Sequence, residues 1–468
     1  SFENRYRFAS DMVKAVKKAC GDDFPVSLRY SVVSKTKGFR KGALPGEEYI
    51  EAGRDMAESE KAARYLADAG YDMLNCDNGT YDAWYWAHPP IYMPENCNLE
   101  DAEHIRPFAG IPVVAAGRLD PYAAADAIKE GKLDGAGFAR SFLADQEWVT
   151  KLISDKADEI RPCILCHNGC FNMCHYKGVP NDQDLSDSLA LARCAVNPET
   201  MQWKKHRIVK TDKPRKVIII GGGIGGMEAA RVLSLRGHKP IIYEKSSRLG
   251  GTFIAASAES YKGKLRELLA WYIREMGTLG VEIHLNEEIH DLSRFGSLDI
   301  IVATGAKPRR LNVPGAERAI EACEFLEGAD VGDRVAVIGG GLTGSEIAYE
   351  LALKGKHPVI IEMKDDLIAQ KGVCLANSSY LREWFELNKT PVYLETSVRE
   401  IRDDAVLCTS RNGREFSVPC DSVISSVGYI PSPIEESGYR VQVIGDADAV
   451  GNLRSVIWSA FEAAARIR

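Results

Sequence analysis

A glycine-rich turn between an apolar strand and a helix occurs twice in this chain, and this repeat restricts the fold more than any other feature. The first copy follows the run Val217–Ile220 and places Gly221, Gly223 and Gly226 in the pattern GxGxxG before the helical segment Met227–Ala230. Glycines permit a tight turn and a close approach of the backbone to a pyrophosphate, whose charge is stabilised at the start of the helix. The segment therefore predicts an α/β unit that binds a dinucleotide.

The second copy repeats this order of elements. Val335–Ile338 leads into a second GxGxxG, and a helix and the strand Val359–Ile361 follow. Its glycines are Gly339, Gly341 and Gly344. A single GxGxxG is weak evidence, but two complete strand–turn–helix–strand units predict two dinucleotide-binding domains.

An acidic residue ends the strand after each turn. Glu244 follows Pro240–Tyr243, and Glu362 follows the corresponding strand of the second unit. A carboxylate at this position meets the hydroxyl groups of a ribose, and it would repel the extra phosphate of NADPH. We therefore expect NADH in the second unit, while Lys364 keeps NADPH open as the alternative.

The first 160 residues alternate helical patterns with short apolar runs. The runs are residues 25–30, 73–76, 112–117 and 135–140. Short apolar runs separated by helices are typical of parallel strands that are buried on both faces. Four such βα units make half of a closed (β/α)8 barrel, so either the sheet is open or four strands precede Ser1. We expect the second, since the chain does not begin with Met.

Composition excludes several classes of partner. The 468 residues carry a net charge of −7, which argues against nucleic-acid binding, and no apolar run is long enough to span a membrane. The twelve cysteines partly cluster, which in a cytoplasmic protein indicates a metal or iron–sulfur site rather than disulfides. We expect a cytoplasmic protein with small-molecule partners. Its oligomeric state stays open, a homo-oligomer included.

The cysteine cluster lies between the half-barrel and the first glycine turn. Cys163, Cys166 and Cys170 have the spacing C-x2-C-x3-C, and Cys174 and Cys194 are candidates for a fourth ligand. Four thiolates hold either zinc or a [4Fe–4S] cluster, and spacing alone does not decide between them. The surrounding residues 161–214 are polar and basic, so we interpret them as a connector rather than as core.

The second half of the chain resembles the flavoprotein disulfide reductases, which have two dinucleotide domains. The segments Ile300–Gly305 and Val443–Asp446, with a C-terminal helix from Ala460, fit that scheme. The resemblance implies FAD in a domain of residues 215–330 and 429–468, and NADH in a domain of residues 331–428. It also implies that Gly445 and Asp446 contact the FAD.

The cysteine segment is similar to that of old yellow enzyme relatives fused to a FAD and NADH module. The similarity rests on Pro162–Cys170 and on Arg193–Pro198, while Glu3–Phe8 matches the start of their fifth barrel helix. This family includes 2-enoate reductases, 2,4-dienoyl-CoA reductases and trimethylamine dehydrogenase. The resemblance implies that residues 1–160 are the C-terminal half of an FMN barrel. It also implies a [4Fe–4S] cluster on Cys163, Cys166, Cys170 and Cys194, although the gap before Cys194 is longer than expected and leaves Cys174 open.

The same resemblance implies further site residues in the half-barrel. Arg29 would face the flavin, and the pairs Gly117–Arg118 and Ala139–Arg140 would bind the FMN phosphate. The segment Cys76–Pro90 resembles the enoate reductase branch, with Tyr81 as a proton donor, His88 as its assistant, and Trp84, Tyr85 and Trp86 as walls of a substrate pocket. Aromatic packing is the alternative role for these side chains.

The predicted function is that of an NADH-dependent ene-reductase acting on an enoate, an enoyl-CoA or a similar unsaturated carbonyl compound. Electrons would pass from NADH to FAD, through the cluster to FMN, and then to the substrate. A steroid or bile-acid desaturase, an amine dehydrogenase of the same family and an electron-transfer module without a substrate of its own remain the alternatives.

Overall fold

The computed structural model describes residues 1–174, 192–370, 372–434 and 440–467. The chain forms two compact units. The first contains Ser1–Ala139 and Leu375–Trp384, and the second contains Arg140–Cys374 and Phe385–Arg468. None of the described helices is long and apolar enough to cross a membrane.

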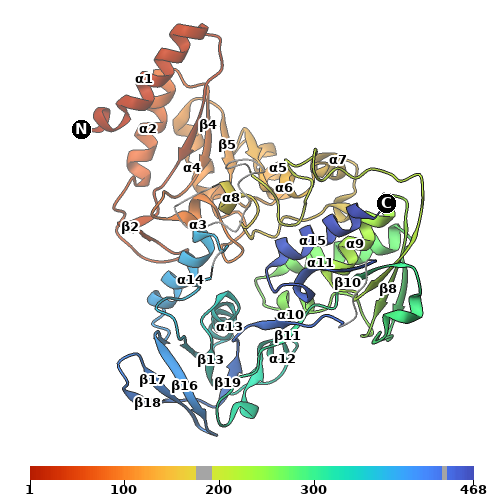
Figure 1. The fold of residues 1–468 in the computed structure, drawn as a ribbon. Helices are drawn as coiled ribbons and strands as arrows, with labels where there is room; N and C mark the ends of the chain where they lie inside the picture. Colours follow the sequence, from red (N-terminus) through yellow and green to blue (C-terminus); the bar gives the residue numbers. More distant parts are fainter. Residues whose placement is uncertain (175–191, 371, 435–439, 468) are drawn as a thin grey trace. The chain divides into compact units, whose positions relative to one another are not determined.

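A parallel sheet of four strands in the order β1-β4-β5-β6 forms the centre of the first unit (Figure 1). The strands are β1 (Ser27–Ser31), β4 (Met73–Asp77), β5 (Val113–Ala116) and β6 (Gly135–Gly137). The helices are α1 (Phe2–Cys20), α2 (Met56–Ala69), α3 (Trp84–Ala87), α4 (Leu99–Ala109) and α5 (Pro121–Lys129), and a short hairpin is formed by β2 (Thr36–Gly38) and β3 (Lys41–Gly42). Each of the four predicted apolar runs is a strand of this sheet.

The two faces of this sheet differ in burial because side chains alternate along a strand. Tyr30, Leu74 and Ala115 point to one face and share a core with residues of α1, α2 and α4. The other face carries Arg29, which is exposed, and Asn75, which is half-buried. Polar side chains are therefore presented on the face that the helices do not cover.

The second unit contains a parallel sheet built around the first glycine turn. Its strand order is β21-β10-β7-β8-β9. The strands are β7 (Lys216–Ile220), β8 (Lys239–Glu244), β9 (Glu282–Leu285), β10 (Asp299–Val302) and β21 (Val441–Val443). The helices are α9 (Ile224–Leu235), α10 (Phe253–Ala256), α11 (Gly263–Thr278) and α15 (Leu453–Arg466). Strand β21 returns to this sheet from the end of the chain, as the resemblance to disulfide reductases implies.

A second parallel sheet, in the order β12-β19-β13-β14-β15, surrounds the second glycine turn. The strands are β12 (Ile320–Glu321), β13 (Arg334–Ile338), β14 (His357–Ile361), β15 (Val392–Tyr393) and β19 (Ser422–Ser425), with helices α12 (Ala322–Leu326) and α13 (Leu342–Leu353). Helix α14 (Leu375–Leu387) lies between β14 and β15 in the chain, and its residues up to Trp384 belong to the first unit. An antiparallel sheet of β16 (Thr396–Ile401), β17 (Ala405–Ser410) and β18 (Glu415–Pro419) follows, and β11 (Ala306–Pro308) pairs with β20 (Tyr429–Pro431). The short helices α6 (Arg140–Ala144), α7 (Trp148–Ile153) and α8 (Phe171–Cys174) precede both sheets in the chain.

Three features differ from the sequence predictions. The connector interpretation of residues 161–214 is wrong for Ile164, Cys194 and Val196, which are buried in the core shared with α9, α11 and α15. The C-terminal helix begins at Leu453 rather than at Ala460, because Asn452 caps it by accepting a hydrogen bond from the Ser455 N–H. Residues 375–384 belong to the first unit, although they lie within the predicted NADH domain.

The first glycine of each turn is required by its backbone geometry. Gly339 has a φ of 103°, and a β-carbon there would lie well inside 3.0 Å of the Ser426 carbonyl oxygen. Replacement Gly339→Ala should lower the free energy of unfolding of the second unit by about 2–4 kcal/mol. Urea unfolding followed by circular dichroism measures this loss.

The matched control is Gly277→Ala in α11, where no atom lies within 4 Å of an added β-carbon. That change should stabilise the protein by about 0.5–1 kcal/mol, since alanine restricts the unfolded chain and favours the helix. Equal effects of the two replacements would show that the close approach at Gly339 does not constrain the fold.

Candidate functional site

The two glycine turns have the same internal geometry. Gly221 has a φ of 107°, and a β-carbon there would collide with the Ala303 carbonyl oxygen, as one at Gly339 would with Ser426. In each unit the first glycine of the turn therefore lies directly against the backbone segment that follows the neighbouring strand. The repeat seen in the sequence is a repeat in three dimensions.

The acidic residue of each unit is buried and bound to its own turn. Glu244 Oε2 accepts a hydrogen bond from Gly222 N at 2.6 Å, and Glu362 Oε2 accepts one from Gly340 N at the same distance. The second oxygen of Glu362 accepts from Lys364 N at 2.8 Å. Each carboxylate is thus fixed beside the turn, at the position where the sequence predicts a ribose.

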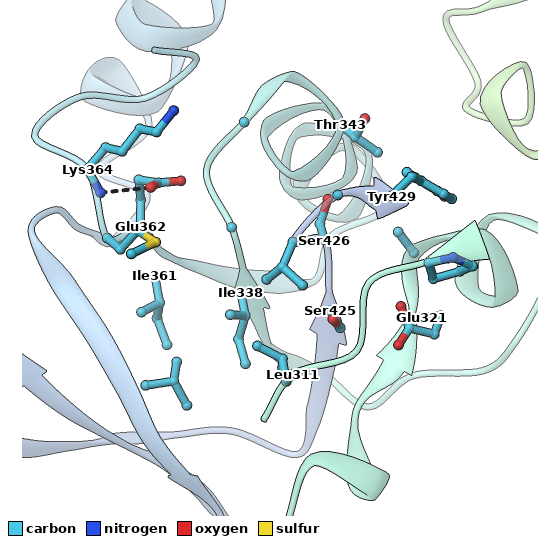
Figure 2. Close-up of a pocket in the computed structure, with 18 of the residues that line it drawn as sticks. Leu311, Glu321, Ile338, Thr343, Ile361, Glu362, Lys364, Ser425, Ser426 and Tyr429 are labelled. Carbon is cyan, nitrogen blue, oxygen red and sulfur yellow. Dashed lines mark hydrogen bonds between the residues drawn. The ribbon is translucent and has the colours of Figure 1, made fainter. Parts of the chain in front are cut away.

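A pocket of about 550 Å³ opens over the second turn (Figure 2). Its lining includes Gly339, Gly341 and Glu362 together with Ser426 and Tyr429. A pocket of this volume, at the carboxyl ends of parallel strands and the start of a helix, fits a dinucleotide. The N–H of Leu342 at the start of α13 is bound by the side-chain oxygen of Gln370 at 3.0 Å.

The space in front of the first glycine turn also has few close neighbours. A β-carbon at Gly223 would meet only the Gly250 carbonyl oxygen, at 4.0 Å, so the space in front of the start of α9 is free of close neighbours. Gly445 has a φ of 60°, and Asp446 accepts a hydrogen bond from Gly451 N at 3.0 Å. Burial raises the pKa of Asp446. These residues fit FAD, whose pyrophosphate needs a cradle without side chains at this turn.

Four cysteines line one small cavity in the second unit. They are Cys163, Cys166, Cys170 and Cys194. Gly169 permits their convergence, because a β-carbon there would lie inside 3.0 Å of the backbone of Cys194 and Ala195. The Arg193 N–H donates to the Gly169 carbonyl at 2.8 Å and joins the two segments. The side chain of the alternative ligand, Cys174, lies outside the described residues.

The cysteine thiols influence one another. Burial, together with the charge of Cys163, raises the pKa of Cys194 to about 12 and that of Cys170 to about 11. Four buried thiols become thiolates together only when a cationic centre compensates their charge, so this donor set fits an iron–sulfur cluster. Among the described residues no three such side chains meet closely enough to hold a single ion. A [4Fe–4S] cluster takes one thiolate on each of four irons and is larger than a single ion, so its ligands need not meet as closely as those of an ion.

One arginine lines the cysteine cavity, and a second binds the carbonyl group of a residue in its lining. Arg140 lines it and places Nη1 2.7 Å from His167 Nε2, and its charge acts on Cys170. Arg161 is buried, stacks on Trp271 and donates to the Val196 carbonyl at 3.0 Å. The FMN phosphate role of Arg140 therefore stays a prediction, since the guanidinium faces the cysteines here.

Arg29 lies in the middle of β1 and is held by a carboxylate from the neighbouring strand. Its Nε donates to Asp77 Oδ2 at 2.8 Å, Nη2 also contacts Asp77, and Nη2 donates to the Ala87 carbonyl at 3.3 Å. On the same face, Asn75 Oδ1 is buried without a partner in the described part of the chain. An unpaired oxygen beside a fixed arginine is compatible with a polar cofactor such as a flavin, which supports the predicted FMN site.

The other predicted phosphate residues lie after β5 and β6. A β-carbon at Gly117 would collide with Asn98, and Arg118 turns back to donate to the carbonyl groups of Pro90, Ile91 and Met93. Ala139 is exposed in the bend before α6. Arg118 thus orders the loop after α3, and its contact with a phosphate remains a prediction.

The aromatic segment after β4 divides into two groups. Tyr81 is 72% exposed and packs edge-on against Trp84 with ring centroids 4.7 Å apart, and His88 stacks on Trp84 at 5.6 Å. Trp86 is buried and donates to the Ala43 carbonyl at 2.6 Å, and Tyr85 donates to Glu383 at 2.8 Å. Tyr85 and Trp86 therefore pack inside the unit, whereas Tyr81 and His88 are accessible to a substrate.

Sequence reasoning missed a buried group of charges next to the second turn. Lys262 Nζ lies 3.0 Å from Glu259 and 2.8 Å from Glu346 of α13. Glu259 Oε2 is buried without a partner among the described residues, and burial raises the pKa of Glu259 to about 6. The only signal was the spacing of Glu259 and Lys262, which is common on protein surfaces.

The pKa of Asp77 gives a pH-dependent prediction. Burial raises this pKa to about 6, against the lowering effect of Arg29. A carboxyl group whose pKa rises on folding contributes its stabilisation below the unfolded value of about 4 and loses it as the pH rises through about 6. The stability of the wild type relative to Asp77→Asn should therefore fall by roughly 2–3 kcal/mol between pH 4 and pH 7.

Asp134→Asn is the control, for which the stability difference from the wild type should change with pH in the opposite direction. Burial acts to raise the pKa of Asp134, but hydrogen bonds from Arg106 and from the Val113 N–H bring it below its usual value. The stability of the wild type relative to this variant should rise as the pH increases through 4. Thermal unfolding from about pH 2 to pH 8 measures both slopes, because the change at Asp134 lies mostly below pH 4, and parallel slopes would contradict the prediction.

Two family models match the chain. The NADH:flavin oxidoreductase / NADH oxidase family matches residues 1–159. The pyridine nucleotide-disulphide oxidoreductase model matches residues 215–446 and so covers both glycine turns.

Known proteins match along the whole chain. It is 39% identical to a cinnamate reductase of Clostridium sporogenes and 30% identical to an NADH oxidase of Thermoanaerobacter brockii, aligns over its full length with both, and covers 70% of each. A solved structure of 2-naphthoyl-CoA reductase with 2-naphthoyl-CoA has a TM-score of 0.84 at 24% identity, with all of this chain and 69% of that structure aligned, which shows a common fold.

These matches confirm the resemblance to flavin enzymes fused to a dinucleotide-binding module, and the cinnamate reductase match agrees with the enoate reductase branch. FMN, FAD and NADH binding are supported by the two matching families. The chain is therefore an oxidoreductase that belongs to the NADH:flavin oxidoreductase / NADH oxidase family, and it joins the flavin domain of that family to a pyridine nucleotide-disulphide oxidoreductase module.

Proposed function

We propose that this protein is an NADH-dependent ene-reductase that reduces the C=C bond of an enoate, an enoyl-CoA or a similar unsaturated carbonyl compound. The observation that carries the proposal is the alignment of the whole chain with a cinnamate reductase, across both redox modules. The accessible Tyr81 and His88 support it, because an alkene reduced by hydride at one carbon needs a proton at the other.

The second glycine turn and its pocket bind NADH in this proposal. Glu362 is fixed by Gly340 N and Lys364 N, and its place beside the pocket suits a ribose with free hydroxyl groups. Gly221, Gly223, Gly226 and Glu244, with Gly445 and Asp446, hold FAD. When bound, FAD, a [4Fe–4S] cluster and FMN supply stepwise electron transfer between NADH and the alkene.

The residues of the first unit hold FMN and the substrate. Arg29, in the middle of β1, is held in place by Asp77 at the end of β4, and its charge favours electron density on a flavin. Gly117, Arg118 and Ala139 complete the FMN site of this unit in the proposal, and a role of Arg140 at the FMN phosphate stays a prediction. Tyr81 protonates the substrate carbon next to the carbonyl group, His88 assists it, and Trp84 orients both rings.

Cys163, Cys166, Cys170 and Cys194 hold the cluster. The support is their common cavity, the approach of the two segments at Gly169 and the chemistry of four buried thiols. Cys194 is further held by the Trp458 indole N–H, which donates to its carbonyl at 3.0 Å. A fixed backbone at the fourth ligand keeps the site ready for a cluster.

Loss of one proposed ligand should remove the iron. Anaerobically purified wild-type protein should contain about four irons and four sulfides per chain, as expected for one [4Fe–4S] cluster. Cys194→Ala should lose most of both while retaining its fold by circular dichroism. Cys20→Ala, at the exposed end of α1, is the control that keeps the iron. Zinc in place of iron, or an unchanged iron content in Cys194→Ala, would contradict this ligand set.

Turnover tests the reaction itself. The protein, purified anaerobically, should oxidise NADH when cinnamate or crotonyl-CoA is added. Tyr81→Phe should lower kcat for the alkene by about 10²-fold, the usual contribution of a general acid. The rate at which NADH bleaches the flavins should stay unchanged, because Tyr81 lies in the unit without the NADH pocket.

Tyr122→Phe is the matched control, since Tyr122 is an exposed tyrosine at the start of α5 in the same unit. NADH oxidation without any alkene dependence would contradict the proposal and favour an electron-transfer module. Turnover of amines instead of alkenes would favour the amine dehydrogenases of the family.

A further inference from the structure

The pocket over the second turn has two chemically different ends (Figure 2). Glu362 and Lys364 lie at one end, and Glu321 and Tyr429 lie at the other. The first end carries the acidic residue that suits the ribose of the adenosine. The second end therefore receives the nicotinamide half of the dinucleotide.

Strand pairing places the second end toward the FAD residues. Tyr429 begins β20 and pairs with Pro308 of β11, and β11 directly follows β10 of the first sheet. The Tyr429 hydroxyl also contacts the Cys323 thiol at 2.7 Å. A nicotinamide must lie at the end of the pocket that faces the flavin domain, and this is that end.

Glu321 is presented to the pocket by the sheet. It ends β12, where it pairs in register with Ser425 of β19, and both residues line the pocket. Ser425 is 2% exposed, and its Oγ has no partner among the described residues. A buried hydroxyl without a partner, next to a carboxylate, is the arrangement that a polar ligand group completes.

The carboxylate of Glu321 has no ion-pair partner within 4.0 Å among the described residues, although the charge of Arg310 acts on it. Burial and the neighbouring Glu324 raise the pKa of Glu321. A nearby cation would relieve both effects. The oxidised nicotinamide ring carries a positive charge, whereas the reduced ring is neutral.

We propose that Glu321 is a specificity-determining residue that favours the oxidised, cationic nicotinamide over the reduced one, and that the Ser425 hydroxyl binds the carboxamide common to both. This inference rests on the proposed NADH function of the pocket. Product NAD⁺ would then bind more tightly than it would in a neutral pocket. Glu321 thereby favours the direction in which NADH gives up its hydride.

The test compares binding of NAD⁺, NADH and ADP-ribose to the anaerobic holoenzyme by titration calorimetry. NAD⁺ is titrated into the oxidised enzyme and NADH into enzyme that has already been reduced, so that neither exchanges electrons with the flavins, and ADP-ribose is titrated into both. Glu321→Gln keeps the size of the side chain and removes its charge. It should weaken NAD⁺ binding about fivefold to tenfold, as expected for one lost charge contact in a partly solvated site, and should change NADH binding less than about twofold. Ser425→Ala should weaken both forms equally, and ADP-ribose, which lacks the nicotinamide, should bind all variants alike.

Glu327→Gln is the matched control because it removes a carboxylate from an exposed residue at the far end of α12, outside the pocket. An effect of equal size in Glu327→Gln and Glu321→Gln would overturn the inference, since any nearby charge would then suffice. Equal weakening of NAD⁺ and NADH by Glu321→Gln, or no change in either, would also overturn it. Failure of the wild type to bind ADP-ribose would instead overturn the NADH function of the pocket itself.

Discussion

Direct contact between two stretches of backbone is the constraint on which the rest of this structure depends. It occurs where Gly221 meets Ala303, where Gly339 meets Ser426, and where Gly169 meets Cys194 and Ala195. At each place a β-carbon would collide with main-chain atoms, so no side chain can be tolerated. The first two contacts bring a turn against the end of the neighbouring strand and leave the start of the next helix open to a phosphate. The third brings the fourth cysteine to the other three. Every proposed cofactor position in the second unit therefore depends on a glycine that touches the backbone of a distant segment.

Buried charge joins the two dinucleotide sheets of the second unit. Lys262 follows α10, which belongs with the first turn, and pairs with Glu346 of α13, which begins at the second turn. Removing three charges from water is costly, and a buried ion pair adds little net stability. The ion pair instead fixes the position of α13, because a shift of α13 relative to Lys262 would leave an unpaired charge in a buried site. Glu259 Oε2 has no hydrogen-bond partner among the described residues, and burial raises the pKa of Glu259, so the negative charge of this group is not fully compensated by Lys262. Such a pair holds the two turns at a fixed separation.

The sequence predicted the regular parts of the fold because they depend on local patterns. Apolar runs gave the strands β1, β4, β7 and β13, and the glycine spacing gave both turns. It did not predict that residues such as Ile164 and Val196 belong to the core, because polar neighbours dominate that segment. Asp77 and Glu321 were also missed. Each is an ordinary acidic residue at the end of a strand, and its role comes from the adjacent strand: Arg29 on β1 for Asp77, and Ser425 on β19 for Glu321. Register between strands distant in sequence cannot be read from a local pattern.

The cysteine cavity differs from the other sites in what fixes it. Cys194 and Val196 share a core with Met227 of α9 and Phe461 of α15, and α9 begins at the first glycine turn. The four sulfurs are therefore positioned by the same helices that position the FAD turn. Tyr81 and Arg29 belong to the other unit and owe their positions to its separate core and to Asp77. A substitution in α9 or α15 should thus disturb both proposed electron-carrying sites of the second unit together, whereas a change around Asp77 should act on the proposed substrate side alone. In the proposed function, the division into two units separates the tuning of electron supply from the choice of substrate.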